Sequence, residues 1–162
     1  MPPPTPFRSR LLGLALALAA GGVGHLAFPS FDVWPAAIAS IGLLWGALTH
    51  LGAVASFAAV FLYAMALYAP MFWWARVAAG TVPWAFLTVA TALLVAIVGP
   101  AWSFARRLRP LAASPAAAAF AFAAIWTAVE ELRAVFPVGG FPWGRLAFSQ
   151  SGSPMLRLAW LG

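Results

Sequence analysis

Long runs without a formal charge divide this sequence, and they limit the chain to folds that a lipid bilayer can contain. The uncharged runs cover residues 11–31, 33–75, 77–105 and 110–129. A helix needs roughly 20 apolar residues to cross about 30 Å of hydrocarbon, and every run is long enough. Hydrophobic residues make up 64% of the 162 positions and charged residues only 7%, whereas a soluble domain has about a quarter charged residues. The sequence therefore predicts an all-α integral membrane protein.

The run over 33–75 is about twice too long for one crossing at 1.5 Å per residue, so we expect it to contain two helices. Its most polar point, over 49–52, is the expected break. We predict about five transmembrane helices, over residues 11–28, 35–49, 52–74, 82–105 and 114–136. The other predicted segments are a cytoplasmic Pro- and Arg-rich tail over 1–10, an outer-face loop over 137–153 and the start of a truncated sixth helix over 154–162.

All nine cations are arginines, and their positions predict how the chain crosses the membrane. Arg8 and Arg10 precede the first helix. Three more arginines follow the fourth predicted helix: Arg106, Arg107 and Arg109. Four crossings place both groups on the same side, which the positive-inside rule makes cytoplasmic.

Residues 1–20 also resemble a signal peptide, but the apolar stretch continues to Phe31, which favours an uncleaved first span. Because the arginines are dispersed between apolar runs, we expect no nucleic-acid partner.

Few residues in this chain can carry chemistry. The absence of cysteine excludes disulfides, thiolate metal ligands and a cysteine nucleophile within these residues. His25 and His50 lie in different predicted helices, without an acidic residue at metal-ligand spacing, so no metal site is expected. Ser149 and its neighbours Ser151 and Ser153 have no nearby histidine and no nucleophile-elbow pattern. We therefore expect no catalytic residue and no cofactor in these 162 residues.

The fifth predicted helix ends in charged residues. Glu130 and Arg133 are three residues apart and share a helix face, so an ion pair at the membrane surface is the favoured interpretation. The alternative is that they bind a lipid head group or hold the following loop in position. Glu131 lies elsewhere on the helix and is expected to be solvated. Asp32 is expected to cap the second helix through its side-chain oxygen.

Two segments resemble bacterial apolipoprotein N-acyltransferases. One is 26–37, after the first helix, and the other is 126–150, where an apolar helix passes into a loop rich in Gly, Pro and aromatic residues. Their order and spacing also fit the family, and the resemblance extends over nearly the whole chain from Leu11 onward. The second segment carries it through these residues: Glu130, Leu132, Arg133, Gly140, Phe141, Pro142, Trp143, Ser149 and Gln150.

The resemblance implies a function in the bacterial plasma (inner) membrane. Members of the family transfer a fatty acyl chain from a phospholipid to the N-terminal diacylglyceryl-cysteine of a lipoprotein. They use a Glu-Lys-Cys triad in a nitrilase-like domain, and this chain contains neither lysine nor cysteine. The implied partners are membrane lipids, the phospholipid donor, the lipoprotein and the missing domain, and the chain alone is expected to be inactive. The lipid- or substrate-facing candidates are Glu130, Arg133, Phe141, Pro142, Trp143, Ser149 and Gln150.

An alternative interpretation is a non-catalytic membrane module that docks a separately encoded acyltransferase or glycosyltransferase. The apolar segment over 154–162 is far shorter than a membrane span, which favours truncation over a stand-alone module.

Overall fold

The computed structural model describes residues 7–137 and 139–161, without the side chains of residues 159–161. Residues 1–6 of the expected tail, residue 138 of the expected loop and residue 162 of the expected sixth helix lie outside the described residues. The described chain is helical and contains no β-strand. Four segments are long and apolar enough to cross a membrane, and one shorter apolar helix accompanies them, which confirms the all-α membrane fold. The four segments are Phe7–His25, Ala53–Met71, Thr81–Ala105 and Pro115–Val135.

The helices follow the uncharged runs of the sequence, with additional breaks near prolines. Pro70 lies inside the third helix and Pro100 follows the break in the fourth predicted span; each lacks an amide hydrogen and crowds the preceding turn. The expected helices over 52–74 and 82–105 are therefore each divided in two. The described elements are α1 (Phe7–His25), α2 (Pro35–Leu48), α3 (Ala53–Met71), α4 (Trp73–Ala79), α5 (Thr81–Ala96), α6 (Val98–Ala105), α7 (Arg109–Ala113), α8 (Pro115–Val135) and the 3₁₀ helices η1 (Leu146–Gln150) and η2 (Pro154–Leu161).

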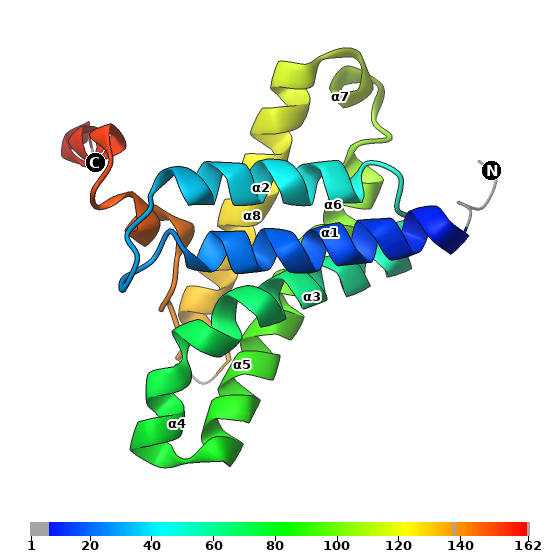
Figure 1. Cartoon of the computed structure of the whole chain (residues 1–162). Coiled ribbons are helices and arrows are strands. Elements are labelled where there is room, and N and C mark those ends of the chain that lie inside the picture. The colour runs from blue at the N-terminus through cyan, green and yellow to red at the C-terminus, as the bar shows by residue number, and fades with distance from the viewer. Residues whose placement is uncertain (1–6, 138, 162) are drawn as a thin grey trace.

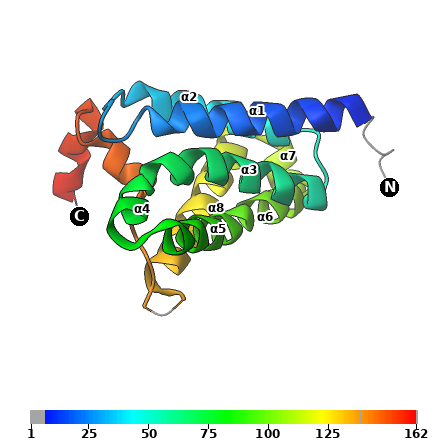
Figure 2. The ribbon, with the colours of Figure 1, turned by 60° about the horizontal axis from the view of Figure 1, so that its bottom comes forward.

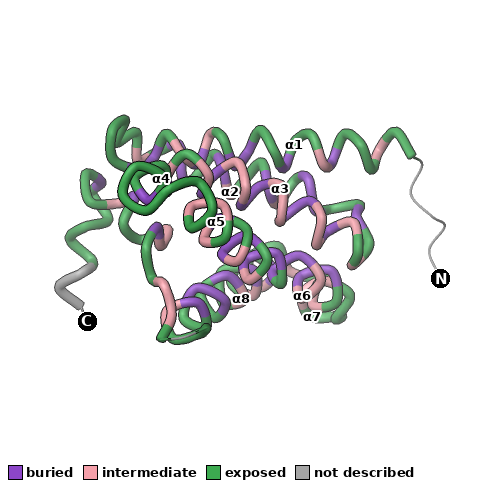
Figure 3. The backbone as a smooth tube through the Cα atoms, turned by 90° about the horizontal axis from the view of Figure 1, so that it is seen from below, coloured by how far each residue is buried: buried purple, intermediate pink, exposed green. Residues whose placement is uncertain are grey.

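Helix α3 is the centre of the bundle. Antiparallel helices α1 and α2 form one layer, and α5, α6 and α8 form the opposite layer (Figures 1 and 2). Helix α1 packs on α2 and α3, α3 packs on α5 and α6, and α8 packs on α5, α6 and α7. Buried positions lie where the helices face one another, and exposed positions follow the outer faces (Figure 3). Those outer faces carry large apolar side chains such as Phe86 and Phe120, as lipid contact requires.

Small residues allow α1 to approach its neighbours closely. Gly13, Gly21 and Gly24 are all buried. A Cβ on Gly13 would lie 3.2 Å from the carbonyl oxygen of Ala47 in α2, and one on Gly24 would lie 2.7 Å from Oγ of Ser40. Without side chains at these points, helix backbones can pack by van der Waals contact and do not depend on a hydrophobic driving force.

The two ends of the bundle differ in charge. The start of α1, the turn after α2, the end of α6 and α7 lie together at one end (Figure 1), which carries five arginines, whereas all three acidic residues lie at the other end. At the arginine end, the Arg106 guanidinium donates to the carbonyl oxygens of Thr49 and Leu51 and so satisfies backbone acceptors after α2. Burial, with a smaller contribution from Arg107, lowers the pKa of Arg106. The opposite end carries the polar site described next.

Candidate functional site

The loop that follows α8 folds back onto the end of that helix. The last carbonyls of a helix have no partner within it, and here the Arg133 carbonyl accepts a hydrogen bond from the Phe141 amide at 2.8 Å. The chain passes closest to the helix at Gly140, which has a φ of +82°. A Cβ at Gly140 would collide with the backbone of Ala134, so this close return requires glycine.

The buried side chain of Arg133 contacts the loop from the interior of the bundle. Its side chain is only 1% exposed, Nη1 donates to the Trp143 carbonyl at 2.8 Å, and Cζ lies 5.1 Å from the ring centroid of Tyr68. Nε and Nη2 have no hydrogen-bond partner among the described residues. The charge is therefore accommodated by a carbonyl dipole and an aromatic face, which fixes the position of the backbone at Trp143.

Glu130 holds the next part of the same loop. Its buried side chain accepts a hydrogen bond from the Leu146 amide at 2.8 Å, at the first residue of η1. The expected ion pair between Glu130 and Arg133 is wrong, because each side chain binds loop backbone. Sharing a helix face brings two residues near each other, but the loop supplies competing partners to both.

The ion pair in the described part of the chain joins Arg145 to Glu131, whose side chain is 57% exposed and therefore solvated, as expected. Both side chains are partly exposed, so the pair contributes little to stability. The expected cap by Asp32 is also wrong. Trp34 occupies the cap position of α2 without a side-chain hydrogen bond, and the Asp32 carbonyl accepts from the Trp34 amide at 3.0 Å.

The remaining candidate lipid- or substrate-facing residues are either packed against other residues or exposed. Phe141 packs edge-on against Phe72, with ring centroids 5.3 Å apart, whereas Pro142 and Trp143 are exposed. Ser149 is buried, and its hydroxyl donates to the Leu146 carbonyl at 2.7 Å. Gln150 donates to Ser149 Oγ at 3.0 Å and, at 3.4 Å, to the carbonyl of Trp34 in the connection before α2. Ser149 and Gln150 thus have structural partners, and the exposed members of the candidate set are Pro142 and Trp143.

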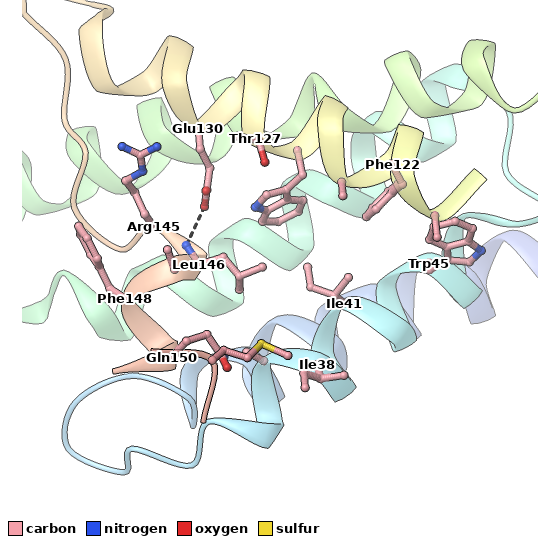
Figure 4. A pocket seen from close by; sticks show the side chains of 16 residues that line it. Ile38, Ile41, Trp45, Phe122, Thr127, Glu130, Arg145, Leu146, Phe148 and Gln150 are labelled. Carbon is pink, nitrogen blue, oxygen red and sulfur yellow. Dashed lines mark hydrogen bonds between the residues drawn. The ribbon is translucent and has the colours of Figure 1, made fainter. Parts of the chain in front are cut away.

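A groove of about 750 Å³ lies between α2 and α8, with η1 at one end (Figure 4). Side chains from both helices point into it (Figure 4). Sequence reasoning missed the groove, because its walls are helices that are distant in the chain. The sequence pattern that could have indicated the groove is the spacing of alanines four residues apart in α8. The lining residues are Ala37, Ile38, Ile41, Trp45, Ala119, Phe122, Ala123, Trp126, Thr127, Glu130, Arg145, Leu146, Ala147, Phe148, Gln150 and Met155.

Replacing Glu130 with alanine is expected to lower the free energy of unfolding by about 2 kcal/mol, because the Leu146 amide loses a charged acceptor in a buried position. Denaturant unfolding in detergent micelles, followed by circular dichroism, measures the change. The neighbouring variant Glu131→Ala breaks only the partly exposed pair with Arg145 and should cost less than about 1 kcal/mol. Equal losses for the two variants would contradict the role given to Glu130.

The fold and the site together define a multi-pass helical membrane protein with its polar residues gathered beneath a loop at one end of the bundle. Residues 20–162 match the family model described as the apolipoprotein N-acyltransferase N-terminal domain. The chain belongs to this family.

Relatives with the same family name support this assignment. The apolipoprotein N-acyltransferase of Pseudomonas putida is 37% identical over 158 residues, and that of Azotobacter vinelandii is 39% identical over 158 residues. The enzyme of Haemophilus ducreyi is 31% identical over 158 residues. Each alignment covers 93% of this chain but only 30–31% of the relative, so the chain spans less than a third of the length of these relatives.

Proposed function

We propose that this chain is the membrane portion of an apolipoprotein N-acyltransferase, which transfers a fatty acyl chain from phospholipid to the N-terminal diacylglyceryl-cysteine of lipoproteins. The observation that carries the proposal is the family match over residues 20–162, which includes all of the site. The partners in the intact enzyme are the phospholipid donor, the diacylglyceryl lipoprotein and a nitrilase-like domain.

In this proposal the loop over 139–150 forms the membrane-side surface that the catalytic domain contacts, and we call this loop the platform. Arg133 and Glu130 hold its backbone at Trp143 and Leu146, so its surface is positioned by two hydrogen bonds from inside the bundle. Pro142 and Trp143 are exposed on that surface, and Trp143 lies against Trp74 with ring centroids 6.1 Å apart. A surface of this kind suits contact with another domain, since an exposed aromatic side chain supplies a large apolar area. The substrate-facing role of Phe141, Ser149 and Gln150 is part of the same proposal.

The chain alone is proposed to be inactive. Acyl transfer through a covalent intermediate needs an activated nucleophile and a base to activate it. The 162 residues contain no cysteine and no lysine, and Ser149, the buried hydroxyl of the loop, donates to a backbone carbonyl. The purified chain should therefore give no N-acylation of a diacylglyceryl lipopeptide in phospholipid micelles. Turnover by the chain alone would overturn this part of the proposal.

A chimera tests the function itself. In the Pseudomonas putida enzyme, the aligned N-terminal part would be replaced by this chain, and N-acylation of the lipopeptide would be measured in membranes. We expect transfer above background, and none from the same chimera with its catalytic cysteine replaced by alanine. A chimera that inserts and folds but does not transfer would overturn the proposed function.

We further propose that the protein lies in the bacterial inner membrane with a cytoplasmic N-terminus. The support is that five of the nine arginines, and none of the acidic residues, lie at one end of the bundle, which the positive-inside rule makes cytoplasmic. Because the chain lacks cysteine, single cysteines can report on each end. A membrane-impermeant maleimide should label Ser151→Cys in intact spheroplasts, whereas Ala113→Cys, at the arginine end, should react only after lysis. The reverse pattern would show that the orientation is inverted.

A further inference from the structure

We propose that the turn between α6 and α7 binds the phosphate of an anionic phospholipid head group through Arg107 and Arg109. The turn lies at the arginine end of the bundle, opposite the platform (Figure 1). The inference requires only that the chain spans a membrane. It does not depend on acyl transfer or on which side of the membrane this end lies.

The turn lies at the depth of the lipid head groups. The membrane-spanning segment Thr81–Ala105 ends immediately before it, and Arg107 and Arg109 follow two and four residues after that end. Both arginine side chains are exposed. A guanidinium just beyond an apolar span extends to the membrane surface, where lipid phosphates are the nearest anions.

Arg106 attaches the turn to the rest of the bundle. Its guanidinium donates to the carbonyl oxygens of Thr49 and Leu51, which lie in the connection between α2 and α3. Within the turn, the Arg107 amide donates to the Phe104 carbonyl at 3.1 Å. The backbone that carries the exposed arginines is therefore held in place, which reduces the conformational freedom lost on binding.

Apolar side chains accompany the exposed cations. The Cζ atom of Arg107 lies 5.6 Å from the ring centroid of Phe104, and both Phe104 and Leu108 are exposed. Contact with an aromatic face leaves the N–H groups at the edge of the guanidinium available to an acceptor. A phospholipid can supply hydrocarbon to Phe104 and Leu108 and a phosphate to the arginines, whereas a soluble anion supplies only the phosphate.

No acidic side chain competes with a ligand at this end of the bundle. The three acidic residues of the chain, Asp32, Glu130 and Glu131, all lie at the other end. The ion pair found within the described ranges joins Glu131 to an arginine of that other end, so it involves neither Arg107 nor Arg109. A zwitterionic head group would bring its ammonium beside the arginines with no carboxylate to receive it. The turn should therefore prefer a head group with a net negative charge.

Arginine has the geometry for this contact. The planar guanidinium can donate two parallel hydrogen bonds to one phosphate, which lysine cannot do. Each basic side chain near an anionic membrane surface strengthens binding about five-fold. Two arginines should together strengthen binding about 25-fold.

Lipid titration of the purified 162-residue chain, followed by native mass spectrometry, tests the inference. The two lipids are phosphatidylglycerol and phosphatidylcholine with identical acyl chains. We expect phosphatidylglycerol to bind with a dissociation constant at least five-fold lower. The double variant Arg107→Gln/Arg109→Gln should weaken the binding of phosphatidylglycerol at least ten-fold and leave that of phosphatidylcholine unchanged.

A matched double variant removes the same charge from the opposite end. Arg76 and Arg157 are both exposed there, and Arg76→Gln/Arg157→Gln should change the binding of phosphatidylglycerol less than two-fold. Equal weakening by the two double variants would overturn the inference, because binding would then follow net charge alone.

Two further measurements use the unmodified chain and so do not depend on the folding of a variant. In nanodiscs, phosphatidylglycerol with a photoreactive head group should label residues 104–109 at least five-fold more than residues 73–77. Even labelling would contradict the proposed position. Inorganic phosphate and glycerophosphoglycerol, at the concentration of the lipid, should not displace it. Displacement by either would show a site for a soluble anion and would overturn the assignment to a lipid.

Discussion

Replacing Gly21 with leucine is expected to lower the free energy of unfolding by about 3 kcal/mol. A Cβ at this position would collide with the carbonyl oxygen of Tyr63 in α3 and would lie 2.9 Å from Cβ of Ala66. The obstacle is backbone, which cannot rotate away as a side chain can, so α1 must move off α3. Overpacking of this kind costs about 1–3 kcal/mol, and a whole leucine side chain at a backbone contact belongs at the upper end of that range.

Gly22 provides the matched control, because a Cβ there meets nothing within 4 Å. Gly22→Leu adds the same side chain one residue away, toward the lipid, and should leave the free energy of unfolding unchanged or raise it by up to about 1 kcal/mol, because leucine favours a helix more than glycine does. Denaturant unfolding of both variants in the same detergent measures the difference. Similar losses would mean that leucine affects α1 itself and that the close contact with Tyr63 is not responsible.

Replacing Gly140 with alanine is expected to cost about 3 kcal/mol and to release the loop from the end of α8. The residue has a φ of +82°, where an L side chain costs about 1–2 kcal/mol. Its Cβ would also collide with the backbone of Ala134, which adds an overpacking cost of about 1–3 kcal/mol. The chain can avoid both costs by breaking the hydrogen bond from Phe141 to Arg133. Amide hydrogen exchange at Phe141 and Leu146 should therefore become faster, together with the loss of stability.

Replacing Gly139 with alanine distinguishes the conformational cost from the overpacking cost. Its φ of +89° is just as unfavourable for alanine, but a Cβ there meets nothing within 4 Å. Gly139→Ala should cost only the conformational part, about 1–2 kcal/mol, and leave exchange at Phe141 nearly unchanged. If the two variants were equivalent, the close return of the loop over Ala134 would not be what holds the platform in position.

Several features of this chain could be predicted because they depend on local sequence. A run of about 20 apolar residues is sufficient to define a membrane helix, and four of the five expected spans are helices long and apolar enough to cross a membrane. The fifth, expected over 35–49, is the shorter apolar helix α2. The candidate residues from Glu130 to Gln150 followed from the resemblance of residues 126–150 to the acyltransferase family.

The partners of those candidates could not be predicted. Glu130 and Arg133 have the spacing of an ion pair, but the choice between pairing and binding the loop depends on where Leu146 and Trp143 lie in space. Backbone groups of a loop compete well for buried charges, because an unpaired amide or carbonyl is itself costly. The pairing of Glu131 with Arg145 has the same origin.

The sequence by itself determined the membrane class of this protein, the approximate number of its helices and the family to which the loop residues pointed, since hydrophobic length and motif spelling are properties of continuous segments. Only the tertiary structure decided that Arg133 and Glu130 hold the loop backbone and that a groove separates α2 from α8. The groove exists because two helices distant in the chain pack on different neighbours and leave the space between them open, and no local pattern encodes a space of that kind.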